Sequence, residues 1–187
     1  MESDAISSLG RAAHDVGLGA LIGGNLFGRL AMHPSLAEVS DASERGKVLN
    51  RSWQRYGPVN GLALASVVVG WVTARLGEAR PSLLTERERK LALAKDAAVG
   101  ALTVTGLATM VGGMRFAASA PDGAVPMATG ETPAAETPPE AARLKGTVRV
   151  LSSLHLASAL GVAGVSAAMA QANFRRPAKR RVLKRRY

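Results

Sequence analysis

The sequence predicts an all-α fold, a small membrane bundle of four transmembrane helices. Val150–Phe174 is a run of 25 residues without a formally charged side chain, with histidine counted as neutral. Tyr56–Ala74 and Ala97–Met114 are similar runs of 19 and 18 residues. A helix that crosses a bilayer needs about 20 apolar residues. Aromatic residues are only 4% of the chain, and the small residues that replace them favour close packing of helices in lipid.

The first expected span, 12–32, is the weakest of the four. It contains His14, Asp15, Asn25 and Arg29, and its longest uncharged stretch is shorter than a bilayer requires. Its glycines include two pairs with small-xxx-small spacing, Gly19 with Gly23 and Gly24 with Gly28, which let a neighbouring helix approach closely. We expect the segment to span with help from its neighbours; a helix lying at the interface or re-entering the membrane is the alternative. His33-Pro34 is expected to end the helix.

The second and third spans are expected at 56–74 and 97–115. The polar residues 35–55 precede the second span, and we expect them to be partly helical, with Trp53 and Tyr56 in an aromatic belt. Pro58 would fall in the first turn of the second span, where proline is tolerated. Thr85 and Glu88 have the spacing of a capping box, which predicts a helix start before the third span.

The last part of the chain combines a low-complexity loop, a span and a basic tail. Residues 117–146 are rich in Pro, Ala, Thr and Glu, which predicts a disordered, extended loop. The fourth span is expected at 150–172. The tail, 175–187, has no acidic residue and eight basic ones: Arg175, Arg176, Lys179, Arg180, Arg181, Lys184, Arg185 and Arg186.

The distribution of Lys and Arg predicts the orientation of the chain. With four spans, both termini and the 75–96 loop share one side, which holds 15 basic residues, and the other side holds eight. The positive-inside rule therefore places both termini in the cytoplasm and the Pro-rich loop outside, in a multi-pass protein of the plasma (inner) membrane.

Polar residues near the membrane are the candidates for chemistry. His14, Asp15, Asn25 and Asp96 could form an intramembrane proton or ion site, with Lys95 beside Asp96. The alternative is structural: side chains that snorkel to the interface, pair across helices or hydrogen-bond a neighbouring helix.

His155 is the one histidine expected deep in the membrane. It could ligate haem or a metal with a second histidine, but His14 and His33 are expected at different depths. We therefore expect a hydrogen bond to Ser152, Ser158 or a neighbouring helix, and no cofactor. Cysteine is absent, which excludes disulfides and thiol catalysis, and the sequence contains no nucleophile motif, carboxylate dyad or phosphate-binding glycine loop.

The expected partners follow from charge and packing. The tail next to a membrane helix favours contact with anionic lipids, and the small-residue faces favour other membrane subunits or a second copy of the chain. A basic tail alone does not indicate a nucleic-acid-binding domain. The sequence thus favours a non-catalytic scaffold or accessory subunit, with a small transporter or channel and a histidine-ligated redox protein as alternatives.

The layout resembles that of four-span bacterial inner-membrane proteins of actinobacterial type. A glycine-rich first span, followed by a polar stretch and the sequence Trp53-Gln54-Arg55-Tyr56, is similar to the TMEM205-like membrane family (domain of unknown function 4149). The likeness covers about a quarter of the chain and implies no site residues.

Overall fold

The computed structural model describes residues 2–77 and 79–174, and four long helices account for most of them. No strand occurs within these ranges; there is one isolated bridge, between Met127 and Pro133. The all-α prediction is confirmed. The long helices are α1 (Glu2–Phe27), α3 (Ala42–Leu76), α4 (Glu86–Ala117) and α5 (Pro139–Phe174), and the short ones are η1 (Gly28–Met32), α2 (His33–Ser35), η2 (Leu36–Glu38), η3 (Pro81–Leu83) and η4 (Pro121–Gly123).

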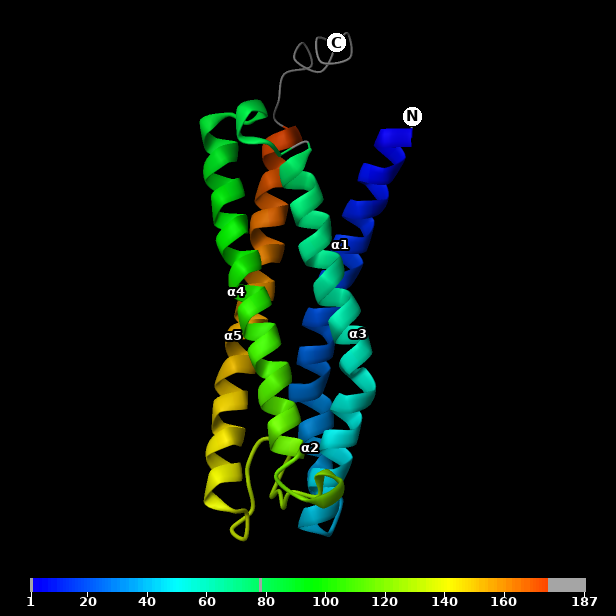
Figure 1. Ribbon diagram of the computed structural model, residues 1–187, viewed down its shortest axis with the longest axis vertical. Coiled ribbons are helices and arrows are strands. Elements are labelled where there is room, and N and C mark those ends of the chain that lie inside the picture. Colours follow the sequence, from blue (N-terminus) through cyan, green and yellow to red (C-terminus); the bar gives the residue numbers. More distant parts are fainter. Residues whose placement is uncertain (1, 78, 175–187) are drawn as a thin grey trace.

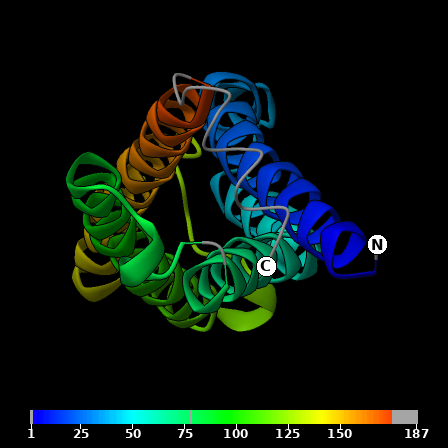
Figure 2. The same ribbon diagram turned by 90° about the horizontal axis from the view of Figure 1, so that it is seen from above.

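The four long helices are arranged as two pairs. α1 packs along α3, and α4 packs along α5, while contacts between the two pairs are fewer (Figures 1 and 2). The start of α1, the α3–α4 connection and the end of α5 lie at the same end of the bundle, which we call the upper end; the start of α1 stands apart from the other two. α2 and the α4–α5 connection lie at the opposite, lower end.

Three helices, α3, α4 and α5, are long and apolar enough to cross a membrane by length and composition. Between 11% and 17% of their most apolar windows is buried within the bundle. Large apolar side chains point outward instead, including Leu62 at 72% exposure and Val104 at 68%. An apolar surface of this extent is typical of a protein that meets lipid or partner subunits rather than water.

The core between the helices is small and closely packed. Its most buried members come from each long helix, with Leu21 on α1, Val67 on α3, Leu102 on α4 and Val162 on α5, all at 1% exposure or less. Trp53 and Tyr56, the residues expected in an aromatic belt, pack against the first helical segment. Trp53 packs over Gly28 of η1, and Tyr56 packs over Gly24 and donates a hydrogen bond to the Ala20 carbonyl at 3.1 Å. The Gly24–Gly28 pair thus provides a close approach within the chain.

Two expected boundaries differ from the structure. α3 begins at Ala42, capped by Asp41, whose carboxylate accepts from the Glu44 amide at 2.8 Å. Pro58 therefore lies inside a continuous helix rather than in its first turn. The first helical segment does not end at His33-Pro34 either. A π-helical turn, η1, follows α1 and leads directly into α2. Pro34 lies in the first positions of α2, where a missing amide hydrogen is tolerated.

The Pro-rich segment 117–146 is the clearest correction to the sequence prediction. It is not extended and disordered: α5 begins at Pro139, and residues 118–138 fold back over the lower end. Val125 and Met127 are buried to 1% exposure or less. Arg45 of α3 donates to the Met127 carbonyl at 2.9 Å, and Asn50 donates to the Gly123 carbonyl at 2.7 Å. These side chains provide hydrogen-bond donors for carbonyl groups of the connection. The composition of the segment could not reveal these donors, because they belong to α3.

Candidate functional site

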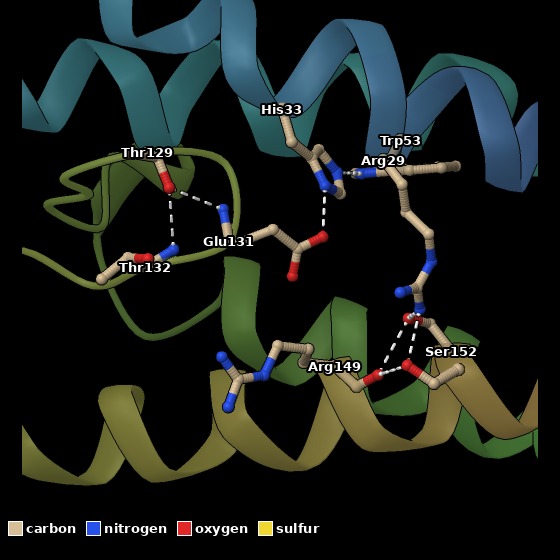
Figure 3. A network of polar contacts seen from close by, with 9 residues as sticks. Arg29, His33, Trp53, Thr129, Glu131, Thr132, Arg149 and Ser152 are labelled. Atoms are coloured by element: carbon tan, nitrogen blue, oxygen red, sulfur yellow. Dashed lines mark hydrogen bonds and ion pairs between the residues drawn. The ribbon is translucent and has the colours of Figure 1, made fainter.

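The lower end holds a polar network centred on His33, which connects α2, α3 and the α4–α5 connection (Figure 3). His33 Nδ1 lies 2.5 Å from Glu131 Oε1, and Trp53 Nε1 lies 3.2 Å from His33 Nε2. Because an indole nitrogen only donates, His33 Nε2 must accept and Nδ1 must carry the proton that is donated to Glu131. The network therefore fixes the orientation of the His33 ring between α3 and the α4–α5 connection.

Backbone contacts fix Glu131 in this position. The Gly130 amide donates to the His33 carbonyl at 3.1 Å, and a Cβ at Gly130 would lie 2.5 Å from His33 Cα. Thr129 Oγ1 accepts from the amides of Glu131 and Thr132, both at 3.1 Å. The turn 129–132 is thus held closely against α2, and its carboxylate points toward the imidazole.

Basic side chains surround Glu131. The hydrogen bond from His33 is the main cause that lowers the pKa of Glu131. Burial acts in the opposite direction, and the electrostatic effects of His33, Lys145 and Arg29 lower the pKa further. Lys145 precedes the 150–172 segment, is 6% exposed and places its ammonium 5.6 Å from the Phe116 ring. Burial lowers the pKa of Lys145 to about 8, because a poorly solvated ammonium is disfavoured.

Arg29 links the two helix pairs at the same end. Its Nη2 donates to Ser152 Oγ at 2.7 Å and to Ser153 Oγ at 2.9 Å, both on α5. Both hydroxyl groups donate in turn to the Arg149 carbonyl. The Arg29 Nε is buried and has no hydrogen-bond partner. Arg29 is thus oriented by α5, with one N–H group left unsatisfied.

A second polar group lies near the upper end, where His14 and Asp15 were expected to contribute. His14 Nδ1 lies 2.9 Å from Asp15 Oδ1, and the Asp15 side chain is 73% exposed. The His14 Nε2 is buried without a partner. Lys95 is close enough to His14 to interact electrostatically, is 7% exposed and lies 4.4 Å from the Trp71 ring centroid. Lys95, rather than its neighbour Asp96, therefore faces the interior at this level of α4.

Asp96 and Asn25 have separate partners. The Asp96 carboxylate accepts two hydrogen bonds from Arg75, each 3.0 Å long, and one from Trp71 Nε1 at 2.8 Å. Asn25 donates to the Leu21 carbonyl of its own helix at 3.3 Å rather than to a neighbour. The four residues His14, Asp15, Asn25 and Asp96 do not share a common set of partners, which argues against a single site made of all four.

His155 is buried and forms a hydrogen bond with a neighbouring helix, which was one of the expected arrangements. Its Nδ1 lies 3.2 Å from the Leu102 carbonyl of α4. Gly106 faces the same ring, and a Cβ there would lie 2.9 Å from His155 Cε1. Within the described residues, no group of three or more His, Cys, Asp or Glu side chains could hold a metal ion. The basic tail, 175–187, lies outside the described residues.

No protein-family model, curated protein or solved structure matches this chain. The site and the fold class therefore stand on the geometry alone: an all-α bundle with three helices apolar enough to cross a membrane and a charged network at its lower end. Sequence reasoning missed the lower-end network, because His33, Trp53 and Glu131 lie in three segments with no common motif. Nothing in the sequence distinguishes Glu131 from Glu136 and Glu140 of the same segment.

Proposed function

We propose that this chain is an integral membrane protein with four spans, near 12–32, 56–74, 97–115 and 150–172, and with both termini in the cytoplasm. In this proposal it acts as a scaffold or accessory subunit of a membrane assembly rather than as a catalyst. The positive-inside distribution of charge supports the orientation. The arrangement in Figure 1 is compatible with this orientation, since the start of α1 and the α3–α4 connection lie at the same end of the bundle.

The outward face of α1 is the observation that carries the proposal. On α1, Val16 is 73% exposed and Phe27 64%, and Leu30 of the adjoining η1 is 76% exposed. Gly19 and Gly23 lie on the exposed side of the helix, and a Cβ at either would meet nothing within 4 Å. This small-xxx-small pair is therefore not used inside the chain, unlike Gly24 and Gly28. An apolar, flat helix face supports both insertion in lipid and docking of another helix.

The internal polar contacts support a structural role for most of the candidate residues. Asp96, Asn25 and His155 each have a partner within the bundle. The tail adds a further element to the proposal: its eight basic residues would bind anionic lipids at the cytoplasmic surface, at about 1 kcal/mol per charge near that surface.

Purification in a mild detergent, followed by native mass spectrometry, tests the scaffold proposal. We expect the wild-type chain to retain a second copy or another membrane subunit, and Gly23→Leu to lose it because the side chain blocks the flat face. Gly100→Leu is the matched control, since Gly100 also faces open space but lies on α4. A lone monomer for the wild-type chain, under conditions that preserve known complexes, would count against the proposal.

A second candidate, a small transporter or channel, is favoured by the buried pair His14 and Lys95. Ionisable side chains inside a membrane bundle often line an ion or proton path, and His14 Nε2 has no partner. Proton flux into proteoliposomes, measured with a pH-sensitive dye, tests this candidate. Flux is expected to fall in Lys95→Met and His14→Ala, and flux equal to that of protein-free vesicles would reject it.

A further inference from the structure

Basic side chains outnumber carboxylates in the cluster around Glu131. Arg29, Lys145 and Arg149 are basic, and Glu131 is the carboxylate whose pKa the charges of Arg29 and Lys145 lower. Positive charge is therefore in excess in this cluster. Near the upper end, by contrast, Arg75 forms an ion pair with Asp96, and Asp15 interacts electrostatically with Lys95. An unbalanced, partly buried cluster attracts ions of the opposite sign more strongly than a solvated one.

Arg29 and Lys145 come from the two helix pairs and both act electrostatically on Glu131, while Arg149 acts on Lys145 and is itself exposed. Arg29 extends from the α1 side toward α5 and is held there by Ser152 and Ser153 (Figure 3). Its Nε is buried and lacks an acceptor. Lys145 is 6% exposed and interacts electrostatically with both Glu131 and Arg149. The lower end thus offers an oriented guanidinium with an unused donor and a buried ammonium, the two groups that proteins use to bind phosphate-type anions.

We propose that the lower end binds a tetrahedral oxyanion of the phosphate class between α1 and α5, held by Arg29, Lys145 and Arg149. The negative charge of the anion offsets the excess positive charge of these three side chains. Its oxygens would give the Arg29 Nε the acceptor that it lacks and would solvate the buried ammonium of Lys145. The anion can come from two sources, a phospholipid headgroup at the outer membrane surface or a free ion in solution.

Lys145 gives the binding a defined dependence on pH. Its pKa is lowered to about 8, so its ammonium becomes neutral as the pH rises through that value. Sulfate is the better soluble probe because its own charge is constant over this range. We expect the affinity for sulfate to be highest below pH 8 and to fall above it, since one of the positive charges is then lost.

The experiment uses the full-length protein, purified in a lipid-free, phosphate-free detergent buffer and titrated with sulfate by calorimetry. Lys145→Gln is expected to weaken binding by about 10-fold to 100-fold, the loss of one charge-assisted contact. Arg143→Gln is the matched control, because Arg143 is an exposed arginine of the same helix, and binding should change little. Glu131→Gln should strengthen binding, because it removes the negative charge of the cluster.

A second arm identifies the source. The protein is placed in nanodiscs of phosphatidylcholine with or without phosphatidylglycerol, and thermal stability is measured. If sulfate binds with the expected pattern among the variants, the ligand is a soluble anion. If sulfate does not bind, but phosphatidylglycerol stabilises the protein and this effect is lost in Lys145→Gln only, the ligand is a lipid headgroup. Absence of both effects, or equal losses in Lys145→Gln and Arg143→Gln, would overturn the proposal. If Lys145→Gln does not fold, the wild-type pH series decides between the outcomes, and an affinity unchanged through pH 8 overturns it.

Discussion

Gly46→Ala tests whether the α4–α5 connection packs against α3. A Cβ at Gly46 would overlap the Val125 carbonyl oxygen and would lie 2.8 Å from its carbon and 3.0 Å from its nitrogen. Alanine in a helix interior is favoured over glycine by about 1 kcal/mol. Overpacking of a filled site costs about 1–3 kcal/mol. Because the overlap is with rigid backbone, we take the upper value and expect a net loss of about 2 kcal/mol in unfolding free energy.

Gly146→Ala is the matched control for this prediction. Gly146 lies in α5, before the 150–172 segment, and a Cβ there would meet nothing within 4 Å. The same substitution should therefore stabilise the protein by about 1 kcal/mol through helix propensity. Denaturant unfolding in detergent, followed by circular dichroism, measures both variants. If Gly46→Ala is as stabilising as Gly146→Ala, the connection does not pack on α3, and the packing described for residues 118–138 is wrong.

Three further predictions concern individual contacts. Asp96→Asn should lower the unfolding free energy by about 1.5–3 kcal/mol, because Arg75 loses its charged partner; the exposed Glu86→Gln should cost less than about 0.5 kcal/mol in the same assay. Because the pKa of Glu131 is lowered in the folded protein, ionised Glu131 contributes to folding stability. This contribution is complete above the ordinary pKa of 4.5 and is lost as the pH falls through the lower pKa of the folded state. Acid titration of stability should show this loss in the wild-type chain but not in Glu131→Gln. Thr85→Ala should cost about 1 kcal/mol by removing the capping box, measured by thermal unfolding.

Local signals in the sequence were sufficient for the helices themselves. The uncharged runs identified α3, α4 and α5, and the Thr85–Glu88 spacing identified the start of α4, where the Glu88 carboxylate accepts from the Thr85 amide at 2.8 Å. The small-residue spacing of Gly24 and Gly28 correctly indicated a close approach. These features depend on residues a few positions apart, so periodicity and capping rules can detect them.

Contacts between distant segments could not be predicted in the same way. The composition of residues 117–146 indicated too little apolar area for the segment to fold alone. It could not indicate the hydrogen-bond donors that α3 provides. Arg45 and Asn50 donate hydrogen bonds to the Met127 and Gly123 carbonyl groups. Val125 and Met127 pack in a buried apolar cluster near the lower end of the bundle. The pairing of His33 with Glu131 is likewise set by the tertiary fold, so no spacing in the sequence could show it.

The same limit applied to the residues near the upper end. Asp96 and Lys95 are adjacent in sequence, and either could have faced the interior. The structure turns Asp96 toward Arg75 and Trp71 and places Lys95 beside His14. A helix rotates successive side chains by about 100 degrees, so which of two neighbours points inward depends on packing that the sequence pattern does not specify.

Single-cysteine labelling tests the central claim, four spans with both termini inside, most directly. The chain has no native cysteine, so Ser3→Cys, Ser82→Cys and Glu136→Cys each report one position. In intact cells, a membrane-impermeant maleimide should label Glu136→Cys, in the α4–α5 connection. Ser3→Cys and Ser82→Cys should react only after the membrane is permeabilised. Labelling of Ser3→Cys in intact cells would show that α1 does not cross, and labelling of Ser82→Cys there would contradict the proposed orientation.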